Sequence, residues 1–108
     1  MDSLPLAERV CPDCQGISLL SKDEIESLLA QLHDWQIEGS HISRTFAFKN
    51  FRQALNLANQ IGDLADNMDH HPQLIVAWGS LQVEIWTHTV NGLTELDFIL
   101  AAKIDRLV

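Results

Sequence analysis

Residues 74–86 read LIVAWGSLQVEIW and contain two extended runs separated by a Gly-Ser pair. The first run is continuously apolar, whereas in the second run Leu81, Val83 and Ile85 alternate with other residues. Alternation with a period of two is typical of a strand with one buried face, and a two-residue loop that begins with Gly is typical of a type II′ hairpin. The stretch therefore predicts a β-hairpin that turns at Gly79-Ser80.

The same pattern occurs earlier in the chain, in residues 35–48. Two extended runs there are joined by Gly39-Ser40 and predict a second hairpin. Between the two hairpins, apolar residues keep helical spacing after a capping signal at Asn50. This helix must end shortly before Pro72, because proline disfavours helical geometry in the residue before it.

Two further helices flank the hairpins. One is amphipathic over 22–32 and begins at the capping-box spacing of Ser21 and Glu24, and the other covers about 95–107. The resulting order, α-β-β-α-β-β-α, predicts an α+β fold with a four-stranded antiparallel sheet and helices packed on one face. Residues 98–102 are apolar on most of the helix circumference, so we expect another copy of the chain to cover the side that one small core leaves open.

Composition narrows the possible functions. The 108 residues are 46% hydrophobic and 20% charged, which is typical of one globular domain. The net charge of −8 argues against direct binding to nucleic acid or to an anionic membrane, since both favour a basic face. No apolar run approaches the ~20 residues of a membrane span, and no secretory signal is visible at the start. We therefore expect a cytoplasmic protein.

The first twenty residues differ from the rest of the chain. Proline and glycine interrupt any periodicity there, so residues 1–20 are predicted to be a flexible N-terminal arm and residues 21–108 a single domain. Cys11 and Cys14 form a lone CxxC in the arm. Such a pair can hold zinc with outside ligands or act as a redox pair, but a reduced, flexible arm is the preferred interpretation.

Three of the five histidines are candidates for chemistry. His70 and His71 lie at a helix exit, and His88 lies at the end of the last strand. A helix exit and a strand end can converge at one edge of a sheet, and imidazole is the side chain best suited to moving protons near neutral pH. In the alternative interpretation, His70 and His71 only cap the helix and lie on a surface loop. Spacing alone favours this alternative.

The surroundings of these histidines add three expectations. Strand alternation places His88 on the side of Trp86, away from the helices, where the indole is placed to stack a planar ligand. Asp97 is interpreted first as the capping-box partner of Thr94. No metal site is expected, because adjacent histidines are an awkward pair for one ion and no metal-binding signature accompanies them. The other two histidines have no supporting neighbours.

Several short motifs, taken together, resemble those of the pterin-4a-carbinolamine dehydratase family. The motifs are Asp69-His70-His71-Pro72, Trp78-Gly79, Thr87-His88, Gly92-Leu93-Thr94 and the DFILAA run of residues 97–102. The combination is far more specific for the family than any one motif, because it requires a His-His-Pro, a distant Thr-His and a following Gly-Leu in a fixed order. The resemblance covers roughly residues 21–107 and is closest to the bacterial members that accompany phenylalanine hydroxylase.

The resemblance implies an activity and a site. Members of this family remove water from 4a-hydroxytetrahydrobiopterin to give quinonoid dihydropterin, so that aromatic amino acid hydroxylases can recycle their cofactor. They use no metal and no cofactor of their own, and the pterin that they bind is the substrate. The resemblance assigns catalysis to His70, His71 and His88, with His70 and His88 as the preferred proton-transfer pair. The implied substrate-binding residues are Asp69, Pro72, Trp86, Thr87, Thr89 and Asp97.

The resemblance also implies partners and an alternative. Family members form homodimers or homotetramers, and a functional link to phenylalanine hydroxylase follows from the bacterial type. Some members act instead as interaction modules, either as a transcriptional cofactor or as an assembly factor. The chain departs from many members at Asp66-Asn67, where they carry Glu-Lys, and at Leu74, where they carry an aromatic residue. Since all three histidines are present, the sequence favours the dehydratase.

Overall fold

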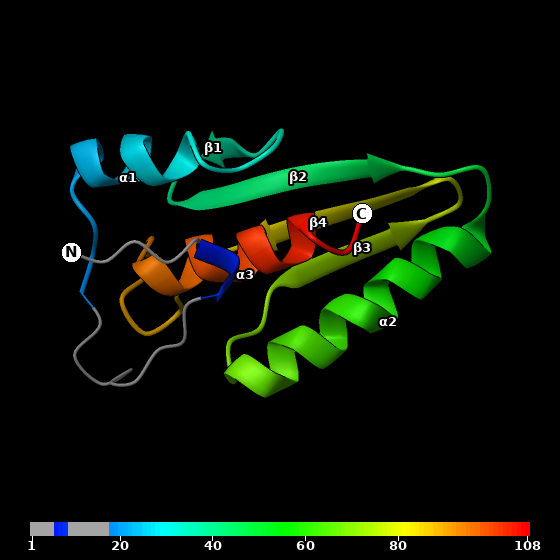
Figure 1. Cartoon of the computed structure of the whole chain (residues 1–108). Helices are drawn as coiled ribbons and strands as arrows, with labels where there is room; N and C mark the ends of the chain where they lie inside the picture. Colours follow the sequence, from blue (N-terminus) through cyan, green and yellow to red (C-terminus); the bar gives the residue numbers. More distant parts are fainter. Residues whose placement is uncertain (1–5, 9–17) are drawn as a thin grey trace.

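The protein is described here by a computed structural model, which covers residues 6–8 and 18–108. Within these residues, three α-helices, one short 3₁₀ helix and four strands follow one another along the chain (Figure 1). In chain order, the elements are η1 (Leu6–Glu8), α1 (Lys22–Leu29), β1 (Gln36–Glu38), β2 (His41–Ala47), α2 (Phe51–Met68), β3 (Gln73–Ala77), β4 (Ser80–Ile85) and α3 (Glu95–Asp105).

The four strands form one antiparallel sheet in the order β1-β2-β4-β3. The two hairpins join through β2 and β4, whose register runs from the pair Ile42 and Ile85 to the pair Ala47 and Ser80. Leu81, Val83 and Ile85 are fully buried, as the alternation predicts for the inner face of β4. Both central strands are therefore held on two sides by backbone hydrogen bonds.

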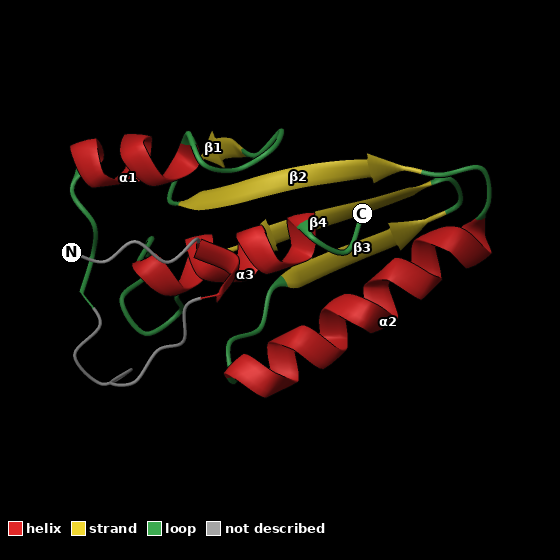
Figure 2. Ribbon diagram, in the orientation of Figure 1, coloured by secondary structure: helices red, strands yellow, loops and turns green. Residues whose placement is uncertain are grey.

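The helices cover one face of the sheet. In Figures 1 and 2, α3 lies in front of the sheet and α2 runs along its β3 edge. Helix α2 contacts β3, β4 and α3, so that one layer of helices buries the inner face. The predicted α+β fold, with its order of elements, is confirmed.

The two hairpins turn differently. Gly39 has φ +64° at the first central position of its turn, as a type II′ hairpin requires. In the second hairpin, Ala77 pairs with Ser80, so the central residues are Trp78 and Gly79 rather than Gly79 and Ser80. Gly79 has φ +83° at the second central position, which is the pattern of a type II turn. The predicted turn was therefore wrong by one residue.

Helix boundaries agree with the predictions to within one turn. Helix α1 ends at Leu29, three residues before the predicted end, and α2 spans its expected range.

The start of α2 is capped by Asn50, whose side chain accepts a hydrogen bond from the amide of Gln53. The Gln53 side chain accepts from the amide of Lys49 and not from that of Asn50. On the apolar face of α2, Leu57 is buried, whereas Phe51 at its first position is 44% exposed.

Helix α3 is enclosed by its own chain. Residues 98–102 are all at most 8% exposed, although a second copy was expected to cover part of them. The sheet lies on one side of α3 and η1 on the other, and Leu6 of η1 is 3% exposed (Figure 1). The Lys103 Nζ atom also donates a hydrogen bond to the Ala7 carbonyl over 2.7 Å. The expectation failed because η1, which the sequence placed in the arm, and α2 both pack against α3 and help to enclose it.

Residues 6–8 therefore differ from the flexible arm that was expected for residues 1–20. The rest of that segment up to residue 17, including Cys11 and Cys14, lies outside the described residues. None of the helices within residues 6–8 and 18–108 is long and apolar enough to cross a membrane.

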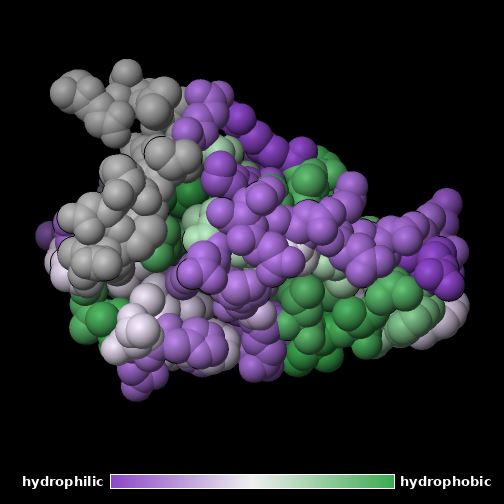
Figure 3. Space-filling model, turned by 90° about the horizontal axis from the view of Figure 1, so that it is seen from below, coloured by the Kyte–Doolittle hydropathy of each residue, from purple (hydrophilic) through white to green (hydrophobic). Residues whose placement is uncertain are grey.

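Seen from below in Figure 3, the surface along α2 and the β3 edge carries a broad hydrophilic band beside a hydrophobic area.

Candidate functional site

The end of α2 points one histidine inwards and the next one outwards. Asp69 follows the helix in a left-handed conformation, with φ 53°. Its amide bonds to the Asp66 carbonyl over 3.3 Å, and the His70 amide bonds to the Ala65 carbonyl over 3.1 Å. These two bonds form a Schellman motif, which reverses the chain at the helix end. As a result His70 is 8% exposed, while the His71 side chain is 58% exposed.

A short closed loop follows β4. The amide of Thr87 bonds to the Gly92 carbonyl over 2.8 Å, and the amide of Gly92 bonds back to the Thr87 carbonyl over 3.3 Å. Asn91 adopts φ 52° inside the loop, which suits an asparagine. The loop holds Thr87 buried and the adjacent His88 exposed. Strand alternation therefore continues beyond the last paired residue of β4.

The helix end and the loop meet around one cavity of about 440 Å³. This volume lies within the range of small-molecule sites, roughly 300–1,000 Å³. The lining residues are Asp69, His70, His71, Pro72, Thr87, His88, Thr89 and Leu96. The structure thus brings together all three candidate histidines and four of the six candidate binding residues. Leu96 is an additional lining residue that no sequence motif marked.

Asp97 lies behind His70 and does not line the cavity. It is fully buried, and its Oδ1 atom lies 2.6 Å from Nε2 of His70. Its Oδ2 atom accepts hydrogen bonds from the Thr87 hydroxyl over 2.9 Å and from the Thr94 amide over 2.8 Å. The carboxylate therefore caps α3, as the sequence indicated, and also contacts the histidine from the end of α2.

The donors in this cluster can be assigned from its geometry. The Thr87 hydroxyl has one proton and donates it to Asp97, so the Thr94 hydroxyl must be the donor in the 2.8 Å contact between the two threonines. An ionised carboxylate only accepts, so Nε2 of His70 carries a proton. Nδ1 is then the only ring nitrogen that His70 can offer to a ligand. Such a buried carboxylate orients a histidine in the way that catalytic triads use.

Trp86 does not lie against the cavity as a flat wall. Its ring stacks on His41 with centroids 3.8 Å apart and on His88 with centroids 4.4 Å apart. At these distances two imidazoles on one face of the indole would overlap, so they cover opposite faces. Both faces are therefore occupied, and stacking of a planar ligand on Trp86 would require one imidazole to leave. His41 was missed in the sequence because its cross-strand position depends on the register of β2 and β4.

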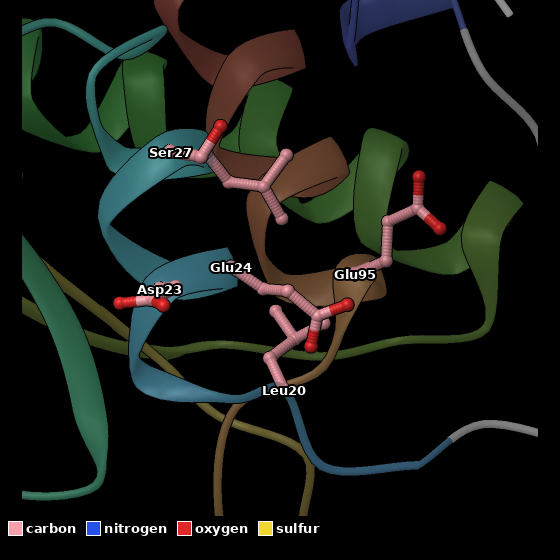
Figure 4. Close-up of a pocket in the computed structure, with 6 residues that line it drawn as sticks. Leu20, Asp23, Glu24, Ser27 and Glu95 are labelled. Atoms are coloured by element: carbon pink, nitrogen blue, oxygen red, sulfur yellow. The ribbon is translucent and has the colours of Figure 1, made fainter. Parts of the chain in front are cut away.

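A second pocket of about 400 Å³ lies between α1 and the start of α3 (Figure 4). Its lining residues are Leu20, Asp23, Glu24, Ser27, Leu28 and Glu95. Glu24 is engaged in the cap of α1, since its Oε1 atom accepts the Ser21 amide over 2.8 Å. None of the candidate residues lies in this pocket, and its acidic lining disfavours anions. In the described part of the chain, no group of three or more His, Cys, Asp or Glu side chains is placed to hold a metal ion.

Comparisons with known proteins bear on this geometry. Residues 18–107 match the family described as Pterin 4 alpha carbinolamine dehydratase. Two relatives carry the name of the same dehydratase. The one from Rickettsia canadensis is 50% identical over 95% of this chain and 97% of the relative. The one from Rubrobacter xylanophilus is 43% identical over 94% of this chain and 97% of the relative. A crystal structure titled transcriptional coactivator/pterin dehydratase from Brucella melitensis matches with a TM-score of 0.78 and 35% identity, over 83% of this chain and 98% of the other.

Proposed function

The chain belongs to the pterin-4a-carbinolamine dehydratase family, and from this membership we propose that it is a hydro-lyase that removes water from 4a-hydroxytetrahydrobiopterin. The observation that carries the proposal is the cavity lined by His70, His71 and His88, with His70 tied to a buried carboxylate. These histidines come from two distant stretches of chain and surround a space of the size that one small heterocycle needs.

The reaction needs two proton transfers. In the substrate, C4a carries a hydroxyl group and the neighbouring N5 carries a hydrogen. When the C4a–O bond breaks, the leaving oxygen takes up a proton, and when the C4a=N5 bond forms, N5 loses its proton. Water and quinonoid dihydropterin are the products, so the step consumes no oxidant or reductant. Each positioned proton-transfer group contributes ~10²–10⁴-fold to the rate of such a reaction.

We assign these transfers to His70 and His88, one as the acid and the other as the base. Asp97 holds the Nε2–H of His70, which directs Nδ1 to the substrate. His88 is exposed at the cavity, and its ring is oriented by Trp86. His71 lies at the rim with its Nε2 atom 3.0 Å from Asp66, a position that suits it to holding the pterin. Asp69, Pro72, Thr87 and Thr89 complete the proposed binding surface.

The experiment is a stopped-flow assay of dehydration with freshly formed 4a-hydroxytetrahydropterin. The wild-type chain should accelerate dehydration above the rate in buffer, and His70→Ala and His88→Ala should each lower kcat by about 10² or more while the fold is retained. His33→Ala is the matched control, because this exposed histidine lies outside the cavity. Near wild-type rates in both cavity variants would eliminate the catalytic assignment.

We also propose the context in which this activity works. The pterin is the substrate, and no further cofactor takes part. The protein acts in the cytoplasm. Its product serves the recycling of tetrahydrobiopterin for phenylalanine hydroxylase. We expect a homodimer or homotetramer, supported by the edge strand β3 and its exposed Ile75, which leave part of the sheet uncovered. Light scattering that gives the single-chain mass of 12.2 kDa at micromolar concentration would contradict assembly.

A second function deserves a direct test because the Brucella melitensis structure is titled a coactivator as well as a dehydratase. In this alternative the fold serves as an interaction module and the histidines are not needed. A double variant, His70→Ala with His88→Ala, separates the two functions. If the double variant still captures a partner that the wild type captures, the binding role is independent of catalysis.

A further inference from the structure

Three rings are stacked on the face of the sheet that the helices leave open. His41 and Trp86 have ring planes 13° apart, and Trp86 and His88 have ring planes 10° apart. His41 belongs to β2, whereas His88 belongs to the loop after β4. The indole therefore connects a residue of a central strand with a residue of the proposed active site.

The far end of this stack is anchored to the sheet. The Nδ1 atom of His41 lies 2.8 Å from Oε2 of Glu84, and the two side chains are 26% and 19% exposed. Glu84 pairs with Ser43 on one side and with Gln73 on the other, so its backbone is fixed by both neighbouring strands. The carboxylate accepts a hydrogen bond from the Nδ1–H group and so restrains the orientation of the His41 ring.

The near end of the stack has little other support. Within residues 6–8 and 18–108, the His88 ring makes no hydrogen bond or ion pair with another side chain, and it is exposed to the cavity. Among the ring contacts of the described residues, His88 has the stacking on Trp86, which restricts its orientation. Without His41, one face of the indole would be bare, and the indole could rotate and carry His88 away from the cavity.

We propose that His41 and Glu84 are positioning residues for His88 and act through the indole of Trp86. This inference rests on the proposed function, because it takes His88 to be a proton-transfer group. A group that transfers a proton must lie within hydrogen-bond reach of the reacting atom, so a loose ring lowers the rate of the chemical step. Substrate binding depends on other residues of the cavity, and KM should therefore change less than kcat.

The kinetic test compares substitutions that remove the stack or its anchor with substitutions that keep them. His41→Ala should lower kcat by about 10- to 100-fold and change KM by no more than about twofold. His41→Phe keeps a flat ring against Trp86 but loses the bond from Nδ1 to Glu84, so it should recover part of the lost kcat and resemble Glu84→Ala. Glu84→Ala should lower kcat, whereas Glu84→Gln keeps an acceptor for Nδ1 and should stay near the wild type. Thr45→Ala is the control, since Thr45 is exposed on the same face of β2.

An NMR measurement tests the positioning without any substrate. His88 stacks on the indole with ring centroids 4.4 Å apart, and the indole ring current should shift the signals of the imidazole protons upfield. His41→Ala should move these signals downfield, towards those of an unstacked histidine, and His41→Phe should leave them near the wild-type position. Circular dichroism on each variant establishes that the fold is retained.

The outcomes separate this inference from the proposed function. A wild-type kcat in His41→Ala, or His88 signals that do not move in it, overturns the inference while the dehydratase activity stands. A wild-type chain without dehydratase activity overturns the proposed function and the catalytic part of the inference. Even then, a downfield movement of the His88 signals in His41→Ala supports the positioning of the ring.

Discussion

The Nε2 atom of His70 lies 2.6 Å from Oδ1 of Asp97, which joins the end of α2 to the first turn of α3. The histidine is 8% exposed and the aspartate is fully buried. The aspartate also receives hydrogen bonds from Thr87 and Thr94, so its position is set before any ligand arrives. The same carboxylate therefore caps α3 and holds His70, the proposed catalytic group.

Asp97→Asn tests this relationship. An amide presents a donor where the carboxylate presents only acceptors, so at least one of the three groups that donate to Asp97 can no longer do so. We expect kcat to fall by about 10²-fold or more, because His70 loses its preferred tautomer and orientation. The measurement is stopped-flow dehydration, with circular dichroism to establish folding.

The matched control for that variant is Asp66→Asn. Asp66 contacts the other histidine of the pair, His71, over 3.0 Å, but both side chains are mostly exposed. An exposed contact of this kind contributes little, so kcat should change by no more than about threefold. Equal losses in the two variants would contradict a special role for the buried carboxylate.

Thr87→Val tests the hydroxyl relay, in which the Thr87 hydroxyl accepts a hydrogen bond from Thr94 and donates one to Asp97. Valine has nearly the same shape as threonine but leaves the buried Thr94 hydroxyl without its acceptor and Asp97 with one donor fewer. We expect the free energy of unfolding to fall by about 1–3 kcal/mol, as measured by urea denaturation. Thr87→Ser keeps the hydroxyl and should lose less stability than Thr87→Val. A valine variant as stable as the wild type would show that the relay contributes nothing to folding.

Substitutions at Asp69 test the reversal that separates His70 from His71. The residue has φ 53°, a conformation that is costly for β-branched side chains and free for glycine. We expect Asp69→Val to lower the free energy of unfolding by about 1–3 kcal/mol, and Asp69→Gly to lower it by less or not at all. Thermal unfolding measures both. If Asp69→Gly also lowers kcat, the loss belongs to the side chain that lines the cavity rather than to the backbone turn.

Leu6→Ala tests whether η1 is a structural part of the domain. Leu6 is 3% exposed in the cover over α3, and truncation of a buried leucine costs about 2–5 kcal/mol. The control is Leu19→Ala, since Leu19 is 57% exposed, and it should change stability by about 0.5 kcal/mol or less. Urea denaturation of both variants gives the comparison. Equal stabilities would indicate that η1 is not needed to cover the helix.

Local patterns in the chain were sufficient to predict much of the fold. Strand alternation in residues 81–85 identified the buried face of β4, and spacing with Pro72 placed the end of α2. The turn at Gly79 was misplaced by one residue because an apolar run such as residues 74–78 has no alternation that marks its end. The enclosure of α3 was missed because it depends on three residues at the other end of the chain.

The amino-acid sequence determined the order of helices and strands, the face of β4 that is buried and the residue types able to move protons, because these properties depend on neighbours a few positions apart. Only the tertiary structure decided that His70 meets Asp97, that His88 stacks on Trp86 and that His41 completes the stack. Those contacts join residues from different elements, and their geometry is set by strand register and helix packing. Hydrophobic periodicity specifies which side of an element is buried, but it does not specify which side chains meet there.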